Sequence, residues 1–216
     1  CFFVIYNNFL LDKEFILMSH LSASNVPDDP ANKNQFERFD NLSNKLHSNV
    51  LKSIANTGCI MNFPEKSYDW VRAGIGIFGG YIGSEELKTT MTLRSQIINI
   101  RDIKKGERVG YDGRGEAKAK MKIATVYIGY ADGLPNHIKD GTLIKINNHD
   151  AKVFGKVNMD VTTVDVTNIP DCNVGDWCEF FSPKDSITNL ATSNSLLSYD
   201  LMIRIKSRVK RIYQDI

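Results

Sequence analysis

The chain has 216 residues, of which 42% are hydrophobic, and 27 basic against 25 acidic residues give a formal net charge of +2. A chain of this size can bury a sizeable core and holds one or two domains. The balanced charge, without a basic stripe interleaved with aromatic residues, argues against a nucleic-acid partner. Because no apolar run approaches the roughly 20 residues of a membrane-spanning helix, no membrane partner is expected either.

The cysteines predict neither a zinc site nor a disulfide framework. Cys1, Cys59, Cys172 and Cys178 form no C-x-x-C pair, and no histidine stands at a spacing typical of zinc ligation. We interpret them as reduced thiols of a cytoplasmic protein. The chain begins with cysteine rather than methionine, and the apolar residues 2–6 do not resemble the polar tether of a lipoprotein, so we expect a fragment of a longer protein.

The first third of the chain alternates between strand-like and helix-like patterns. Apolar residues recur every three or four positions from Asn34 to Leu46, which predicts an amphipathic helix, and the polar, proline-containing residues 22–33 predict a loop before it. Short strands are expected at residues 15–19, 50–55 and 70–78. This alternation is typical of a parallel sheet or barrel, in which polar residues gather at the carboxyl ends of the strands.

After Gly83 the pattern changes to short runs separated by glycine, proline and asparagine turns. Residues 91–100 alternate without a helical signal, residues 106–115 predict a glycine-rich loop, and residues 187–203 carry helical spacing with a Ser-Asn-Ser break. Strands are expected at residues 122–128, 142–146, 151–157, 162–166 and 177–181. We therefore expect a separate, mainly antiparallel β domain that begins near Gly83.

A set of chemically useful residues stands at or just after the ends of the expected parallel strands. These residues are His20, Asn56, Thr57, Arg72, Gly74 and Ile75. Together they indicate an anion site, in which a hydroxyl and main-chain amides surround a phosphate while an arginine and a histidine face a ring. Each also has a simpler explanation: His20 as a core histidine, Arg72 as a surface cation, Gly74 as a packing residue.

Six motifs in a fixed order resemble the alanine racemase family. Residues 53–59 (SIANTGC) and 62–79 (NFPEKSYDWVRAGIGIFG) resemble its A-N-S … F-P … D-x-V-R-P-G-I-x-x-Y-G segment. Residues 17–25 and 35–39 resemble S-H-x-A-x-A-D … Q-x-x-x-F. The downstream motifs are residues 106–113 (GERVGYDG), 129–133 (GYADG), 155–160 (GKVNMD) with 164–167, and 207–213 (SRVKRIY). Any one motif is weak, but their shared order over residues 15–213 is specific.

The resemblance implies an α/β plus β architecture. Residues 1–83 would supply the last strands of a TIM-type (β/α)8 barrel that binds pyridoxal 5'-phosphate, and residues 84–216 the family's mainly antiparallel C-terminal β domain. It also implies interconversion of L-alanine and D-alanine by two bases, of which one removes the Cα proton on one face and the other returns a proton on the opposite face. The D-alanine would serve peptidoglycan. The implied setting is a cytoplasmic homodimer acting on alanine as a small-molecule substrate.

The resemblance further assigns roles to the residues of the first part of the chain. His20 matches the histidine that packs on the cofactor ring, and Arg72 the arginine at the pyridine nitrogen. Thr57 stands in place of the usual serine on the phosphate, and Asn56 is its neighbour in the same loop. Gly74 and Ile75 match positions whose main-chain amides reach that phosphate.

In the second part, Tyr111 matches the tyrosine that serves as one catalytic base and acts across the dimer interface. Met159 matches a position whose backbone contacts the substrate. By itself, the Gly-Tyr-Ala-Asp-Gly turn presents Tyr130 as a surface aromatic, whereas the resemblance makes it a residue of the inner entryway. The pKa of a free tyrosine is about 10, so a tyrosine that acts as a base needs neighbouring cations to lower its pKa. His20 and Arg72 are available for this.

The chain also departs from the family pattern. Asn25, Ala73 and Asn136 replace an aspartate, a proline and an arginine, and Ser207 stands where some members have a phosphate-binding tyrosine. No segment before Phe15 matches the one that carries the family's Schiff-base lysine, the second base. We therefore expect the chain alone to be inactive, and an inactive remnant or one half of a split racemase remains the alternative. A decarboxylase-type pyridoxal-phosphate barrel fits the motif order less well.

Overall fold

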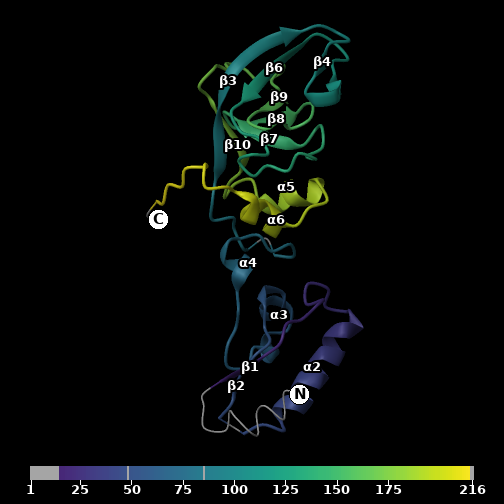
Figure 1. The fold of residues 1–216 in the computed structure, drawn as a ribbon, viewed down its shortest axis with the longest axis vertical. Coiled ribbons are helices and arrows are strands. Elements are labelled where there is room, and N and C mark those ends of the chain that lie inside the picture. Colours follow the sequence, from purple (N-terminus) through teal and green to yellow (C-terminus); the bar gives the residue numbers. More distant parts are fainter. Residues whose placement is uncertain (1–14, 48, 85, 215–216) are drawn as a thin grey trace. The chain divides into compact units, whose positions relative to one another are not determined.

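The computed structural model describes residues 15–47, 49–84 and 86–214, so the interpretations of Cys1 and of residues 2–6 lie outside it. The chain folds into two compact units (Figure 1). Unit 1 comprises the described residues up to Ile77 together with Tyr81–Ser84, and unit 2 comprises Phe78–Gly80 and the described residues that follow Ser84.

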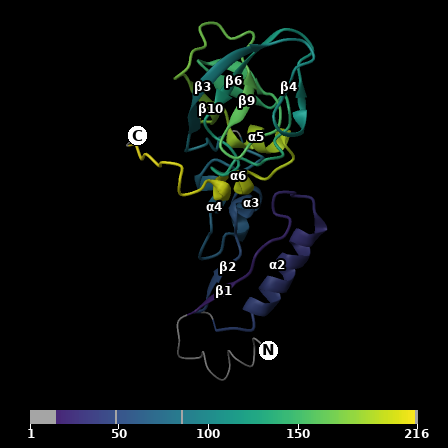
Figure 2. The ribbon, with the colours of Figure 1, turned by 45° about the horizontal axis from the view of Figure 1, so that its top comes forward.

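Unit 1 is built around two short parallel strands, β1 (Ile16–Met18) and β2 (Leu51–Ser53). Ile16 lies opposite Leu51 and Met18 opposite Ser53. The helix α2 (Pro30–Ser43) joins the strands in sequence and lies beside them in both ribbon views (Figures 1 and 2). The predicted order of strand, helix and parallel strand is confirmed for this part of the chain.

The start of α2 differs from the sequence prediction. The helix begins at Pro30, four residues before Asn34, because the Asp29 carboxylate accepts a hydrogen bond from Ala31 N at 2.8 Å and proline suits the first helical turn. The prediction of a loop through residue 33 was therefore wrong at its end. The Asp-Pro pair in the sequence was an unused signal for this helix start.

The core of unit 1 lies between α2 and the strands. The apolar face of the helix contributes Phe36 and Phe39, which are 7% and 5% exposed. The buried hydrophobic residues that complete this cluster are Leu17, Leu21, Val50, Ile54, Ala55 and Cys59. This packing holds the ends of β1 and β2, and the polar residues that follow them, in fixed positions.

The prediction of a single strand over residues 70–78 was wrong. Extended pairing is limited to Trp70–Arg72, where Trp70 N donates to Lys52 O and Arg72 N donates to Ala55 O. The backbone then turns into α4 (Gly74–Ile77), since glycine weakens a strand and offers no side chain to pack. The other short helices of unit 1 are α3 (Thr57–Asn62) and the 3-10 helix η2 (Pro64–Lys66).

Unit 2 is a closed, six-stranded antiparallel barrel with the strand order β10-β3-β6-β9-β8-β7. Its strands are β3 (Leu93–Ile103), β6 (Met121–Val126), β7 (Leu143–Ile146), β8 (His149–Val153), β9 (Thr162–Asp165) and β10 (Trp177–Phe181). The prediction of a mainly antiparallel β domain is confirmed. Strand β8 ends earlier than expected because the backbone turns at Gly155, whose φ is +85°.

Alternating side chains fill the interior of this barrel. Ile97, Val126, Ile146 and Val164 are all 0% exposed and belong to one buried cluster. The helices α5 (Ile187–Ser193) and α6 (Ser198–Arg204) add to the same cluster and lie at one end of the barrel (Figure 1). The two helices separate at the Ser-Asn-Ser break that the sequence indicated.

The glycine-rich segment after β3 is more ordered than the predicted loop. It contains β4 (Arg108–Val109), the 3-10 helix η3 (Tyr111–Gly113) and β5 (Gly115–Glu116), and β4 pairs with β5. The result is a short hairpin that carries Tyr111 at its tip.

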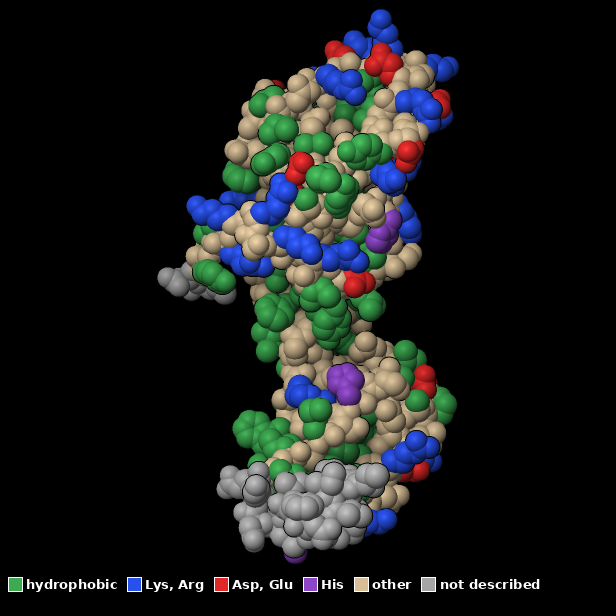
Figure 3. Space-filling view, in the orientation of Figure 1, with side chains coloured by type: hydrophobic (Ala, Val, Ile, Leu, Met, Phe, Trp, Pro, Cys, Tyr) green, Lys and Arg blue, Asp and Glu red, His purple; other side chains and the backbone are tan. Residues whose placement is uncertain are grey.

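Hydrophobic side chains are also exposed on the surface of each unit (Figure 3).

Candidate active site

Arg72 is the centre of the polar cluster in unit 1. Its Nη1 donates to Ser53 Oγ at 2.6 Å, and its Nη2 donates to Ser19 O at 2.7 Å. Nη2 also lies 3.3 Å from Nδ1 of His20. Among the described residues, none of these contacts is a carboxylate, so the guanidinium charge stays available to a ligand.

Asn56 and Thr57 form the second part of this cluster. The Asn56 carbonyl oxygen accepts from Cys59 N at 3.0 Å, which caps α3, and from Ser24 Oγ at 2.7 Å. Thr57 is 5% exposed, and its Oγ1 accepts from Gly76 N at 3.1 Å, so the start of α3 is tied to α4. The hydroxyl of Thr57 retains its own proton as a donor.

The first turn of α4 contributes main-chain groups rather than side chains. A Cβ placed on Gly74 would meet no atom within 4 Å in the described structure, so space adjoins this residue. Ile75 as a whole is 4% exposed, so its side chain packs inward. Residues 53–58 and 72–77 contain no acidic side chain. This set of donors fits an anionic group such as a phosphate.

All six residues predicted from the strand ends therefore lie in unit 1, on three segments that the contacts described above join. The isolated parallel bridge between Asn56 and Arg72 places the two segments side by side. His20 is exposed rather than buried, which removes the explanation of a core histidine. The sequence interpretation missed the anchoring role of Ser53, a small polar residue that faces inward in β2 and is 3% exposed.

A buried thiol lies beneath the start of α3. Burial, with a smaller contribution from Glu65, raises the pKa of Cys59 to about 11. Cys59 is 0% exposed and sits two residues after Thr57. It is therefore a neutral, packed side chain at neutral pH and not a nucleophile of this cluster.

In unit 2, Tyr111 stands at the tip of the β4–β5 hairpin and is 52% exposed. Arg108 fixes the hairpin, because its Nε donates to Gly113 O at 3.0 Å and its Nη2 donates to Asp112 O at 2.8 Å. Gly110 has a φ of +79°, and a Cβ there would lie 2.8 Å from Lys156 N. The hairpin is thus held close to the segment that follows β8.

Tyr130 and Met159 lie on two segments that are hydrogen-bonded to each other. Tyr130 N donates to Asn158 O at 3.0 Å, and Ala131 N donates to Met159 O at 2.9 Å. Both side chains are partly exposed, Tyr130 at 37% and Met159 at 49%. The structure therefore brings together two residues that are 29 positions apart in the sequence.

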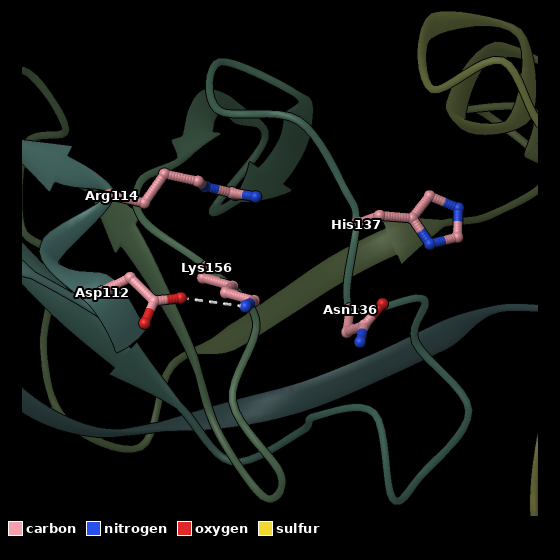
Figure 4. A pocket seen from close by; sticks show the side chains of 5 residues that line it. All are labelled: Asp112, Arg114, Asn136, His137 and Lys156. Atoms are coloured by element: carbon pink, nitrogen blue, oxygen red, sulfur yellow. Dashed lines mark hydrogen bonds and ion pairs between the residues drawn. The ribbon is translucent and has the colours of Figure 1, made fainter.

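A pocket of about 580 Å³ adjoins the Tyr111 hairpin (Figure 4). Its lining residues are Asp112, Arg114, Asn136, His137 and Lys156, of which Lys156 pairs with Asp112 at 3.1 Å. Nη2 of Arg114 donates to the carbonyl oxygens of Ile138 and Gly155, each at 2.7 Å. The sequence singled out Asn136 and contained Asp112 and Lys156 within two of the quoted motifs, but it gave no sign that these residues line one pocket.

Two further observations concern the part of the chain that the structure describes. It holds no cluster of three or more His, Cys, Asp or Glu side chains that could bind a metal ion. None of its helices combines the length and the hydrophobicity needed to cross a bilayer.

The two units define the class of the protein. A helix-covered parallel unit with hydrogen-bond donors suited to an anion at its strand ends is followed by a six-stranded antiparallel barrel. The barrel carries an exposed tyrosine on a hydrogen-bonded hairpin. Residues 90–213 match the model of the alanine racemase C-terminal domain, and residues 13–82 match that of the alanine racemase N-terminal domain. The chain belongs to the alanine racemase family.

Individual relatives agree with this assignment. The chain is 35% identical over 208 residues to an alanine racemase of Alteromonas mediterranea, covering 94% of this chain and 58% of the relative. It is 34% identical over 206 residues to the catabolic alanine racemase of Pseudomonas aeruginosa, covering 93% and 57%. The chain thus spans less than two thirds of the length of the curated relatives it matches.

Solved structures give the same result. The biosynthetic alanine racemase of Pseudomonas aeruginosa matches with a TM-score of 0.89 and 31% identity, over 94% of this chain and 58% of that one. The alanine racemase of Bartonella henselae, whose structure contains covalently bound pyridoxal phosphate, matches with a TM-score of 0.88 and 26% identity, over 98% and 60%.

Proposed function

We propose that this chain serves an enzyme that interconverts L-alanine and D-alanine with pyridoxal 5'-phosphate as cofactor, and so supplies D-alanine for peptidoglycan. The observation that carries the proposal is the network of Arg72, His20 and Thr57 at the carboxyl ends of β1 and β2. Membership of the alanine racemase family supports it, as does the covalently bound pyridoxal phosphate of the Bartonella henselae relative.

The proposal divides the chain at about residue 83. Residues 1–83 would belong to the C-terminal part of a TIM-type (β/α)8 barrel, which the parallel pairing of β1 and β2 and the covering helix α2 support. Residues 84–216 would be the alanine racemase C-terminal β domain, which the six-stranded barrel supports. The active protein would be a cytoplasmic homodimer.

Unit 1 would hold the cofactor. When bound, pyridoxal phosphate supplies the electron sink that allows an amino acid to lose the proton on Cα. The Thr57 hydroxyl and the main-chain amides of Gly74 and Ile75 would donate to the phosphate, and Asn56 would keep Thr57 in place. His20 would pack on the ring. Arg72 would donate to the ring nitrogen, and since the guanidinium keeps its own protons, it would prevent that nitrogen from taking a full proton.

Unit 2 would supply one of the two bases. Tyr111 would remove or return the proton on one face of Cα and would act at the cofactor site of the second subunit of the dimer. The backbone of Met159 would orient the substrate, and Tyr130 would line its route. The second base would be the lysine that the family carries in its early barrel.

The 216 residues on their own would not racemise alanine. Among the described residues, unit 1 has a two-stranded parallel sheet and one isolated parallel bridge, whereas a closed barrel of this type needs eight strands. The strand residues Ile16, Met18 and Leu51 are 47%, 62% and 41% exposed, as expected of a sheet that needs further cover. The remaining strands would come from the same polypeptide or from a second chain, and an inactive remnant is the alternative.

The first experiment uses the purified 216-residue chain with added pyridoxal phosphate. We expect no racemisation of either alanine enantiomer. Because the free cofactor forms imines with any accessible lysine, borohydride reduction should give only scattered, substoichiometric attachment rather than one cofactor on one lysine, as measured by mass spectrometry of the peptides. Covalently attached cofactor together with racemase activity would contradict the proposed dependence on further barrel strands.

The second experiment completes the barrel by joining the chain to the N-terminal part of the catabolic racemase of Pseudomonas aeruginosa. In heavy water, Tyr111→Phe should abolish exchange of the Cα proton from one enantiomer while the cofactor stays bound. Tyr127→Phe is the matched control, because Tyr127 is 57% exposed on the same unit. Equal loss of exchange from both enantiomers would instead indicate a structural role for Tyr111.

A further inference from the structure

Arg208 connects the two motifs that carry Tyr130 and Met159. Its Nε lies 2.8 Å from Asp132 Oδ1, and its Nη2 lies 2.8 Å from Asp160 Oδ1. The two carboxylates belong to different loops and come together only in the folded unit. One planar guanidinium therefore bridges both with separate N–H groups.

Asp132 links this contact to the turn that presents Tyr130. Its side chain is 12% exposed, and its Oδ2 accepts from Gly129 N at 2.8 Å. The carbonyl oxygen of Asp132 accepts from Lys206 N at 3.0 Å, so the C-terminal segment is tied to the same turn twice. The Asp132 carboxylate thus joins the first residue of the turn, Gly129, to Arg208.

Asp160 links the contact to the segment of Met159, its neighbour in sequence. That segment accepts two main-chain hydrogen bonds from the turn, which come from Tyr130 and Ala131. A Cβ on Gly129 would lie 2.3 Å from the carbonyl oxygen of Asn158 and 2.3 Å from that of Met159, so the two backbones are in direct contact. The position of Tyr130 relative to Met159 thus depends on how the backbones of residues 129–131 and 158–159 align.

We propose that Arg208 is a positioning residue that fixes Tyr130 against Met159 through Asp132 and Asp160. The Arg208 side chain is 43% exposed, and an ion pair this accessible contributes little to global stability. Its effect is instead local, because loss of Arg208 removes the side-chain link between the two loops and leaves them joined by main-chain hydrogen bonds alone. A lysine could reach one carboxylate as a point charge but could not replace the two-pronged contact.

The first test uses the full 216-residue chain and does not depend on racemase activity. Arg208→Gln should raise the exchange rates of the Tyr130 and Ala131 amides about tenfold, while the rates in β3 and β6 and the urea midpoint stay unchanged. Arg208→Lys should give a smaller rise. Arg211→Gln is the matched control, since Arg211 lies in the same segment and makes one described contact, to Ile205 O at 3.2 Å.

Two results would overturn the proposal in this test. Unchanged amide exchange at Tyr130 and Ala131 in Arg208→Gln would show that the two ion pairs of Arg208 do not hold the turn of residues 129–133. A uniform rise over the whole barrel with a lower urea midpoint would show that Arg208 acts only on global stability.

The second test rests on the proposed function and uses the barrel-completed enzyme. Arg208→Gln should raise KM for alanine about fivefold or more with kcat changed less than about twofold, because Tyr130 and Met159 contact arriving substrate rather than the transferred proton. A fall in kcat at constant KM would overturn the assignment. If the enzyme with Arg208 intact is inactive, the proposed function fails, whereas the amide-exchange result still decides the positioning role.

Discussion

Arg72 donates a hydrogen bond to His20, with Nη2 and Nδ1 3.3 Å apart. An arginine has only donors, so Nδ1 of the imidazole has to be the acceptor. On the other side of the ring, Nε2 lies 3.5 Å from Asn56 Nδ2, which is also a donor. Because a neutral imidazole accepts at one nitrogen only, the shorter contact with Arg72 favours Nδ1 as the acceptor and orients the ring beside the end of β1.

The first prediction concerns this tautomer. In neutral His20, the proton should sit on Nε2, and ¹⁵N NMR of the histidine ring should show Nδ1 as the unprotonated nitrogen. Arg72→Gln should weaken this preference, whereas the ring signals of His149, which lies in unit 2, should not change. Predominant protonation of Nδ1 in the wild-type chain would contradict the hydrogen bond.

The second prediction concerns the pH dependence of unit 1. Burial tends to raise the pKa of Asp40, but hydrogen bonds from Tyr68 and Lys66 outweigh it, and the pKa is lowered below its ordinary value of 3.8. A carboxyl group with a lowered pKa stabilises the fold fully above its unfolded pKa and loses this contribution as the pH falls through the folded value.

Asp40→Asn should therefore lower the free energy of unfolding by about 1 kcal/mol at pH 7, after allowance for solvent screening. The difference from the wild type should stay constant above about pH 5 and shrink below about pH 4. Urea titrations over this pH range give the measurement. Asp28→Asn, on the exposed loop before α2, is the control, and a difference that grows on acidification would have the wrong sign.

The third prediction uses two adjacent isoleucines of β3. Ile97 is 0% exposed inside the barrel, whereas Ile98 is 48% exposed on its outside. Ile97→Ala should cost about 2–5 kcal/mol of unfolding free energy because it leaves a cavity, and Ile98→Ala should cost less than about 1 kcal/mol. Urea unfolding followed by Trp177 fluorescence in a Trp70→Phe background reports on unit 2. Equal costs would mean that the inside and outside of β3 are assigned incorrectly.

The fourth prediction concerns the thiols that the structure describes. Cys59 and Cys178 are 0% exposed, Cys172 is partly exposed, and burial raises the pKa of all three. At pH 8, iodoacetamide should label Cys172 first, as measured by mass spectrometry of the peptides. In urea the three rates should converge. Native labelling of Cys178 as fast as that of Cys172 would contradict its buried position.

Local sequence patterns predicted most of the secondary structure of unit 2. The strands β7, β9 and β10 follow from alternating or β-branched runs between turn residues, because the side chains of a strand point to opposite faces in turn. In unit 1, Asp29 and Pro30 also encoded the start of α2, although the prediction did not use this signal. The stretch of residues 70–78 misled, because apolar and aromatic residues favour a strand whereas the backbone there pairs only up to Arg72.

The candidate site was only partly predictable. His20, Thr57 and Arg72 could be named from strand ends and motif order, since the carboxyl ends of parallel strands meet at one edge. Ser53 and Arg208 could not, because their roles come from contacts with residues 19 and 48 positions away, respectively, that no local spacing records.

The sequence by itself determined the family, the change from a parallel α/β pattern to an antiparallel β pattern, and the residue types available for chemistry. These properties follow from periodicity and motif order, which are local along the chain. Only the tertiary structure decided that Arg72 is anchored by Ser53 and Ser19, and that one guanidinium joins Asp132 to Asp160. Such contacts depend on loops that meet after the core has packed, and their geometry cannot be read from residue spacing.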